Sequence, residues 1–394
     1  MKCVYSNRII IHYESTRLKK MKILLVRPWP YKLNIDSYNV QEIGLSRALV
    51  KLGHKCGIVL YLEEGKSYSE KYELGITIYY LRGHNILKNG LFGKELKEII
   101  DGYDIIQVHE YDQIQSWKLY TNIHNKKVII YHGPYYDSFN KGYNLKCSVF
   151  DHIFLPFSSK AKNEVQCLTK SPLAADFLKS KGFKNVVSVG VGLDTKPFEG
   201  DGISDIARLL PDDKINIIYV GKLEERRNTP FLLELMSRII TDIPSAFCTI
   251  VGTGDSSYMD QVQREIDVLK STGRFIHIEK ASQKALAEVY KKADIMLFPS
   301  NYEIFGMVLL EAMYFGNAVI SSINGGSSEL IADGVNGCIC ETFVLEEWFE
   351  KAKELINNRE LLCSLKTNAS ITVKENYTWD KLAEKFEQLY MLVD

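Results

Sequence analysis

Two glutamates eight positions apart, Glu303 and Glu311, have the type and spacing to bind a polyhydroxylated ligand. The apolar run Ile295–Pro299 predicts a buried strand before Glu303, and Phe305–Phe315 predicts a helix after it. The first amides of a helix lack partners within that helix, and ligands bind beyond the carboxyl ends of parallel strands. Carboxylates that flank free amides therefore suit sugar-like hydroxyls. The structural alternative makes Glu303 a partner of the helix dipole and Glu311 a solvated helix residue.

A cationic segment follows the apolar run Ile215–Val220, which predicts another buried strand. Gly221 allows close approach to the backbone, and Lys222 together with Arg226 or Arg227 can converge on phosphate oxygens. The second half of the chain is otherwise acidic, so this cluster favours a phosphate site over a solvated surface.

Two glycine turns give weaker signals of the same kind. Gly252 and Gly254 follow the predicted strand Ala246–Val251, and the segment Asn324–Leu330 is a glycine-serine turn that leads into a helix. Their amides have the right type to hold phosphate or ribose, but glycines after parallel strands are also common turn residues.

His109 and His132 each come directly after an apolar run, at the predicted strand ends 104–108 and 127–131. Gly133 follows His132 and is the third candidate site residue in this half of the chain. A lone histidine is more often structural, but two at neighbouring strand ends favour a functional role. The sequence contains no Asp-x-Asp motif, no His-x-His pattern and no Cys-x-x-Cys pair, so no metal site is predicted. The eight cysteines are scattered, which fits a reducing compartment.

Short apolar runs alternate with helical patterns along the whole chain, which predicts an α/β protein with parallel sheets. A stretch rich in turn formers near residues 195–212 predicts the linker between two Rossmann-like domains that face each other across a cleft. The domains are expected at residues 21–195 and 212–375, with a final helical segment at 376–394. Residues 1–20, which precede a second methionine, are expected to be a disordered extension.

The formal charge of zero over 394 residues hides two oppositely charged halves. Residues 1–195 carry 28 Lys+Arg against 18 Asp+Glu, whereas residues 196–394 carry 21 against 31. This asymmetry predicts different tasks for the two halves, and no nucleic acid is expected as a partner.

No apolar run reaches the roughly 18 residues of a membrane span, and no signal peptide is evident, so a cytoplasmic location is expected. Lys88, Lys94 and Lys97 lie among apolar residues at 87–99, where a basic amphipathic helix would contact an anionic membrane; the alternative is a solvated helix.

Taken in order, these motifs resemble the retaining glycosyltransferases of family 4, which have the GT-B fold. The family's Glu-x7-Glu motif is matched by Glu303 and Glu311, and its phosphate loop by the segment 221–228. Its glycine-glycine turn is matched by residues 325–329, and Leu52-Gly53-His54 resembles a helix end of the family. The resemblance spans essentially residues 21–392.

The resemblance implies a role for each matched residue. Lys222 and Arg227 would neutralise the diphosphate of a nucleotide-sugar, and Glu303 would hold the donor sugar's hydroxyls. His109, His132 and Gly133 would lie on the acceptor side, where His132 would contact the reacting centre. Glu311 would hold the ribose. The implied donor site comprises Gly221, Lys222, Arg227, Gly252, Gly254, Glu303, Ile304, Phe305, Gly306, Met307, Val308 and Glu311. The last helix, headed by Trp379, would cross back onto the first domain.

The implied activity is transfer of a hexose-type sugar to a glycan or lipid-linked acceptor, in bacterial cell-surface glycan or glycolipid synthesis at the inner face of the membrane. No metal or other cofactor is expected, since Lys, Arg and amides can offset the leaving group's charge. Lys222 stands where the family has arginine, and Ile304 replaces a common glycine. The alternatives are a nucleotide-sugar epimerase of the same fold and a non-catalytic sugar-nucleotide or glycan-binding protein.

Overall fold

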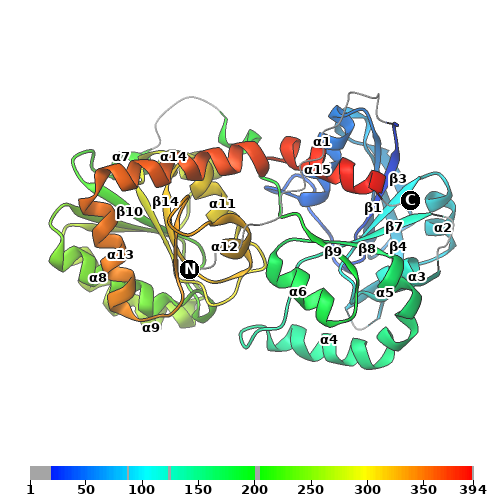
Figure 1. Cartoon of the computed structure of the whole chain (residues 1–394), viewed down its shortest axis with the longest axis horizontal. Helices are drawn as coiled ribbons and strands as arrows, with labels where there is room; N and C mark the ends of the chain where they lie inside the picture. Colours follow the sequence, from blue (N-terminus) through cyan, green and yellow to red (C-terminus); the bar gives the residue numbers. More distant parts are fainter. Residues whose placement is uncertain (1–18, 87, 123–125, 200–204, 393–394) are drawn as a thin grey trace, which may run out of the picture.

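The computed structural model describes residues 19–86, 88–122, 126–199 and 205–392. Within these residues the chain forms two sheets that lie side by side, each with helices on both faces (Figure 1). The predicted α/β class is confirmed. The expected disordered extension at residues 1–20 falls almost entirely outside the described part of the chain, which begins at Lys19.

The N-terminal sheet has nine described strands in the order β3-β4-β2-β1-β6-β7-β8-β9, with β5 paired to β4. The pairs β3·β4 and β4·β5 are antiparallel, and the other pairs are parallel. The strands are β1 (Lys22–Val26), β2 (Lys55–Leu62), β3 (Tyr68–Lys71), β4 (Thr77–Ile86), β5 (Asn89–Phe92), β6 (Ile105–His109), β7 (Lys127–His132), β8 (Gln166–Thr169) and β9 (Asn185–Ser188).

The helices around this sheet are α1 (Gln41–Lys51), α2 (Lys94–Asp101), α3 (Ile114–Asn122), α4 (Lys141–Ile153), α5 (Ser159–Glu164) and α6 (Pro172–Ser180). The predicted basic amphipathic helix at 87–99 is wrong in its bounds and its orientation. Lys88 has a positive φ of 63°, and the residues after it form strand β5. Leu96 of α2 is buried in the core, so this helix turns its apolar side inward rather than toward a membrane.

The C-terminal sheet is parallel throughout, in the order β12-β11-β10-β13-β14-β15. Its strands are β10 (Ile215–Val220), β11 (Ala246–Val251), β12 (Phe275–Ile278), β13 (Ile295–Phe298), β14 (Ala318–Ser322) and β15 (Cys338–Cys340). The helices of this half are α7 (Asp205–Arg208), α8 (Thr229–Asp242), α9 (Ser256–Ser271), α10 (Gln283–Lys292), α11 (Met307–Tyr314), α12 (Gly325–Leu330), α13 (Leu345–Asn357), α14 (Arg359–Asn376) and α15 (Trp379–Leu392).

Helix α11 begins two residues later than the sequence predicts. Gly306 is its N-cap, with a φ of 77° that side-chain-bearing residues rarely adopt. Phe305 and Gly306 therefore belong to the loop before the helix.

The chain returns to the N-terminal half at its end, where α15 packs against α1 (Figure 1). The amide of Leu193 donates to the carbonyl of Tyr377 over 2.7 Å, so the outgoing and returning segments lie side by side. The indole of Trp379 donates to Oδ1 of Asn39 over 2.9 Å. A Cβ atom added to Gly192 would lie 2.3 Å from that indole, so glycine is needed at this close contact.

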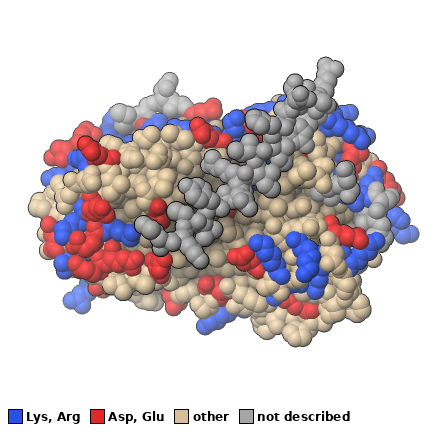
Figure 2. Space-filling view, in the orientation of Figure 1, with Lys and Arg blue, Asp and Glu red and all other residues tan. Residues whose placement is uncertain are grey.

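Acidic side chains gather at the end of the molecule built by α8, α9 and α13, in agreement with the negative charge of the second half (Figure 2). In the described part of the chain, no helix is both long and apolar enough to cross a bilayer.

Candidate active site

The loops that carry His132 and Glu303 meet between the two sheets. A Cβ atom added to Gly133 would lie 2.7 Å from Cγ2 of Ile304, so the two loops touch. The hydroxyl of Tyr135 donates to the carbonyl of Glu303 over 2.9 Å and accepts from the amide of Gly325 over 3.0 Å. Residues 132–135 of one half are therefore held directly against residues 303–304 of the other.

Glu303 is buried and bound by two arginines. Nη1 of Arg226 lies 2.8 Å from its Oε1, and Nη1 of Arg227 contacts the same oxygen. The solvated-surface alternative therefore does not fit the two arginines, whereas Lys222 is exposed. The residue pattern left Arg226 and Arg227 open and the family resemblance selected Arg227, whereas in the structure both arginines contact Glu303. Two guanidinium groups on one carboxylate oxygen make a strongly charged, rigid pair of donors.

Lys222 is joined to these arginines through Glu224, which the sequence analysis did not select. Nζ of Lys222 lies 3.7 Å from Oε2 of Glu224, whose Oε1 accepts from Arg226 over 2.7 Å. Lys222 also donates to Asp255 over 3.0 Å, and this hydrogen bond raises the pKa of the lysine. The segment is thus an alternating network of charges rather than an isolated cationic island.

The predicted glycines shape this network by close backbone packing. A Cβ atom at Gly252 would lie 1.9 Å from the carbonyl oxygen of Gly221, and one at Gly254 would lie 2.4 Å from that of Leu223. Both contacts exclude a side chain. The two glycine turns therefore fix the course of the Lys222 loop.

The glycine-serine turn at α12 supports the neighbouring loop instead of offering free amides to a ligand. The side chain of Asn324 accepts hydrogen bonds from the amides of Gly326 and Ser327. The amide of Gly325 donates to the carbonyl of Glu303 and to the hydroxyl of Tyr135. Because these amides are occupied, the segment fits the structural-turn alternative better than an open phosphate or ribose cradle. A Cβ atom at Gly326 would lie 1.6 Å from the carbonyl oxygen of Phe305, so the turn supports the loop that carries Glu303.

Glu311 is buried, which excludes the solvated alternative. Its carboxylate accepts from the hydroxyl of Tyr38 over 2.7 Å and from that of Tyr290 over 3.0 Å. Burial raises its pKa to about 7, although both hydrogen bonds act to lower it. Tyr38 precedes α1 in the N-terminal half, so this contact also crosses between the halves.

His132 is fully buried at the end of β7, and Nδ1 lies 2.5 Å from Oε2 of Glu110. Glu110 also accepts from the amide of Gly133 over 3.0 Å and lies 3.5 Å from Nζ of Lys170. Burial alone would raise the pKa of Glu110, but Lys170 and His132 hold it well below the ordinary range. The carboxylate thereby fixes the orientation of the imidazole, whose Nε2 has no partner among the described residues.

His109, at the end of the neighbouring strand β6, has different side-chain contacts. Its ring meets Trp29 edge-on at 5.6 Å, and Nδ1 lies 3.6 Å from Oε1 of Glu42. Burial lowers its pKa to about 4, with Glu42 acting in the opposite direction, so the imidazole is neutral near pH 7.

Glu110, Asp112 and His132 bring three potential metal-ligand atoms within 4.8 Å of one another. Each carboxylate already has a lysine partner, because Lys146 lies 3.0 Å from Asp112 and Lys170 lies 3.5 Å from Glu110. Two ammonium groups this close oppose a divalent cation, so the residues fit a balanced charge cluster better than a metal centre.

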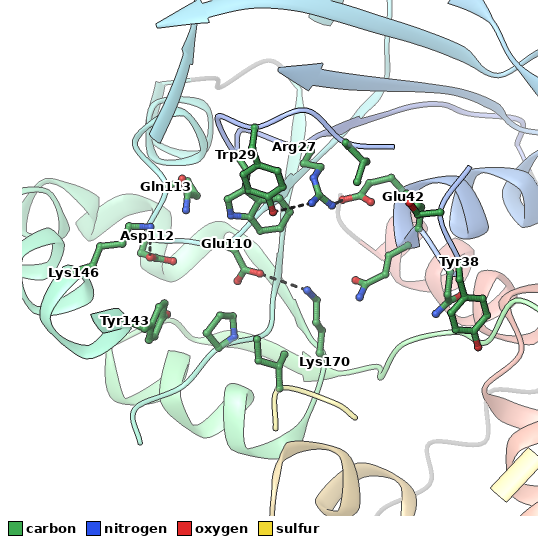
Figure 3. A pocket seen from close by; sticks show the side chains of 18 residues that line it. Arg27, Trp29, Tyr38, Glu42, Glu110, Asp112, Gln113, Tyr143, Lys146 and Lys170 are labelled. Atoms are coloured by element: carbon green, nitrogen blue, oxygen red, sulfur yellow. Dashed lines mark hydrogen bonds and ion pairs between the residues drawn. The ribbon is translucent and has the colours of Figure 1, made fainter. Parts of the chain in front are cut away.

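A cavity of about 520 Å³ opens beside this cluster at the carboxyl ends of β1 and β6 (Figure 3). Its polar and aromatic walls were not predicted, because they come from loops far apart in the sequence. The lining includes Arg27, Trp29, Tyr31, Glu42, Glu110, Asp112, Gln113, Tyr143, Lys146, Lys170 and Ile304.

Comparison with known proteins gives the site its context. Residues 204–372 match the family model of glycosyl transferases group 1. An uncharacterised glycosyltransferase of Methanocaldococcus jannaschii is 24% identical, over 94% of this chain and 98% of its own. The solved sucrose-phosphate synthase of Thermosynechococcus elongatus superposes with a TM-score of 0.70 at 17% identity, covering 95% of this chain and 99% of its own.

These matches support a glycosyltransferase. The chain has the GT-B fold of the solved structures. HepE of Anabaena, solved in complex with UDP, superposes with a TM-score of 0.69 at 13% identity, over 95% of this chain and all of that chain. A D-inositol 3-phosphate glycosyltransferase of Mycolicibacterium smegmatis is 28% identical, but the match covers only 50% of this chain and 44% of the relative. The family match includes Lys222, Glu303 and Glu311 but not His132.

Proposed function

We propose that the protein is a retaining glycosyltransferase that moves a hexose-type sugar from a nucleotide-diphosphate sugar to an acceptor hydroxyl. The observation that carries this proposal is the meeting of Glu303 and its two arginines with the His132 loop of the opposite half. The glycosyltransferase relatives support it, as do solved structures of the same fold with UDP or UDP-glucose bound.

The cations would act on the leaving group. Lys222, Arg227 and the neighbouring Arg226 would share their hydrogen bonds between the acidic side chains and the diphosphate as its charge develops. Glu303, with the amides of Phe305 and Gly306 close by, would hold hydroxyls of the donor sugar.

Glu311 would bind the ribose hydroxyls in place of Tyr38. The carboxylate already accepts two hydroxyl hydrogen bonds, so its geometry suits this ligand. The early residues of α11, Met307 and Val308, would line the same part of the site.

In the transfer step, the bond between the anomeric carbon and the diphosphate oxygen breaks. A bond to the acceptor oxygen forms on the same face of the sugar, and the departing diphosphate takes the acceptor's proton. His132 would contact the sugar at this centre, oriented by Glu110. No step requires a metal ion, since arginine, lysine and amide groups offset the developing charge.

The proposed setting is bacterial cell-surface glycan or glycolipid synthesis, in the cytoplasm at the inner face of the membrane. Helix α4 supports contact with an anionic bilayer better than the segment 87–99 does. Leu145, Val149 and Ile153 form an exposed row on α4, and Phe157 beyond it is 75% exposed. The same helix turns Tyr143 and Lys146 into the cavity, so a lipid-linked acceptor at this surface would reach the site.

Sedimentation with liposomes that contain anionic lipid tests this surface. The protein is expected to co-sediment at low salt, and Leu145→Ser with Phe157→Ser is expected to weaken binding. Val268→Ser, at an exposed apolar position on α9, is the matched control. Equal binding of all variants, or no binding, would contradict the membrane contact.

The donor is tested by thermal shift with UDP-, GDP-, ADP- and dTDP-sugars, because a ligand that binds the native state raises the unfolding temperature. We expect one nucleotide class to stabilise the protein, with UDP-glucose the first to test. NMR of the product then reports the anomeric configuration. Retention is expected, and an inverted product would overturn the proposed mechanism.

A further inference from the structure

The cavity beside His132 has walls that indicate what it binds. Its volume of about 520 Å³ falls within the range of small-molecule pockets. Trp29 and Tyr31 give it an aromatic wall, with ring centroids 6.4 Å apart, and α4 closes the opposite side with Tyr143 and Lys146 (Figure 3).

The charges that line this cavity balance in pairs. Arg27 binds Glu42 over 3.0 Å. The other charged residues that line the cavity form the two ion pairs described above, Lys146–Asp112 and Lys170–Glu110. A phosphate group would have to break one of these pairs, at the cost of leaving a buried carboxylate without its partner. The charge pattern therefore favours a ligand without net charge.

The polar atoms without hydrogen-bond partners are mainly acceptors. Oε2 of Glu42, Oδ1 of Asp112 and Oε1 of Gln113 are buried and find no donor in the described part of the chain. The three residues are 1–3% exposed, and all three line the cavity. The hydroxyl of Tyr143 is a fourth such atom. Buried acceptors require donors, and closely spaced hydroxyl groups supply several at once.

We propose that the cavity binds the acceptor as a neutral saccharide, whose hydroxyls donate to Glu42, Asp112 and Gln113 beside the Trp29 wall. This inference rests on the proposed function for the identity of the ligand as acceptor. It goes beyond that function by assigning the acceptor's chemical class and the residues that select it. A hexose phosphate is expected to bind more weakly, because it would compete with these buried ion pairs, and its binding is an outcome of the test.

Intrinsic tryptophan fluorescence of the full chain measures binding without any donor or turnover. Maltose, trehalose and methyl α-mannoside are titrated, with glucose 6-phosphate and mannose 6-phosphate as the charged counterparts. We expect saturable changes with at least one neutral saccharide, and binding at least ten-fold weaker for the hexose phosphates. Trp29→Phe is expected to remove the fluorescence change, which assigns the signal to this wall. Equal or tighter binding of the phosphates, or no saturable change with any neutral saccharide, would overturn the proposal.

Two variants separate hydrogen bonding from charge. Gln113→Met keeps the size of the side chain and removes the acceptor atom, so it is expected to weaken neutral saccharide binding about three- to ten-fold. Asp112→Asn leaves Lys146 unpaired, so it is expected to weaken neutral saccharides and to improve the relative binding of hexose phosphates. Gln263→Met, on the exposed face of α9, is the matched control. Unchanged saccharide binding in both cavity variants would contradict the assignment.

Failure of this inference is distinguishable from failure of the proposed function. If no nucleotide-sugar shifts the unfolding temperature, the transferase proposal fails while the fluorescence titration still reports on the cavity. If nucleotide-sugars bind and neutral saccharides do not, only the acceptor assignment fails.

Discussion

The donor-side network around Glu303 and the cavity beside His132 differ in how their polar groups are satisfied. On the donor side, Lys222, Arg226 and Arg227 each have an acidic partner, and Glu303 has two arginines. In the cavity the charges are also paired, but several buried oxygen acceptors have no donor among the residues that the structure describes. In our proposals, the first region redistributes its ionic hydrogen bonds to the donor's diphosphate, whereas the second receives hydroxyl groups of the acceptor.

The largest expected effect tests whether the donor-side network is catalytic. Glu303→Gln keeps the shape but weakens both arginine contacts, so turnover is expected to fall about 10²- to 10³-fold, the range typical for losing one preorganised group. The measurement is the initial rate of transfer from the donor that thermal shift identifies. Glu346→Gln, at an exposed position on α13, is the control. Full turnover in Glu303→Gln would favour the alternative in which the network only positions the loop.

Glu311 gives a prediction about stability, because its carboxyl group is buried and has no cationic partner within the described part of the chain. Its folded-state pKa of about 7 exceeds the ordinary value of 4.5, so the folded state holds a proton that the unfolded state loses. The free energy of unfolding is therefore expected to fall as pH rises from about 4.5 to about 7. Relative to the parent protein, Glu311→Gln should gain about 3 kcal/mol over that interval.

Thermal unfolding from pH 4.5 to 8 measures this difference, with Glu346→Gln again as the control. A constant difference between Glu311→Gln and the parent protein across that range would show that Glu311 titrates normally. The carboxylate would then be hydrated rather than enclosed by the two tyrosines.

A smaller effect distinguishes the two tyrosines on Glu311. Both hydrogen bonds lower the pKa of this carboxyl group, so Tyr38→Phe and Tyr290→Phe should each move the pH dependence to higher pH, by less than about one unit. Tyr290 lies in the same half as Glu311, whereas Tyr38 lies in the other. A shift in Tyr290→Phe but not in Tyr38→Phe would mean that the halves are apart in solution.

No effect is expected from removing divalent cations. Treatment with EDTA should leave the rate of transfer within about two-fold of the untreated value, since cationic side chains offset the leaving group's charge. If activity is lost and Mn²⁺ restores it, the cluster of Glu110, Asp112 and His132 becomes the first candidate for the metal site. Loss of the Mn²⁺ response in Asp112→Asn would then confirm that location.

The two regions also differ in how far the sequence predicts them. Strands β10 and β11 have the predicted bounds, because strands buried on both faces appear as uninterrupted apolar runs. The residues of the donor-side network lie in short segments next to such strands, so reading along the chain finds most of them. The choice between Arg226 and Arg227 could not be made, because both reach the same oxygen.

The cavity is built from segments spread between Arg27 and Ile304, and no local pattern links them. Strand β3 was missed for another reason. All four of its residues are exposed, so it carries no alternating apolar signal. The late start of α11 depends on the backbone angle of Gly306, which only the surrounding packing determines.

The hydrogen-bonded pairing of Leu193 with Tyr377 and Trp379 has a mechanical consequence. Among the described residues, the segment that leaves the N-terminal half at Leu193 and the segment that returns to it at Tyr377 are fastened to each other rather than spaced apart. A joint of this kind resists twisting and sliding but permits rotation about one line. Opening of the molecule to admit a nucleotide would then be a single swing, with Tyr38 and Glu311 separating as it begins.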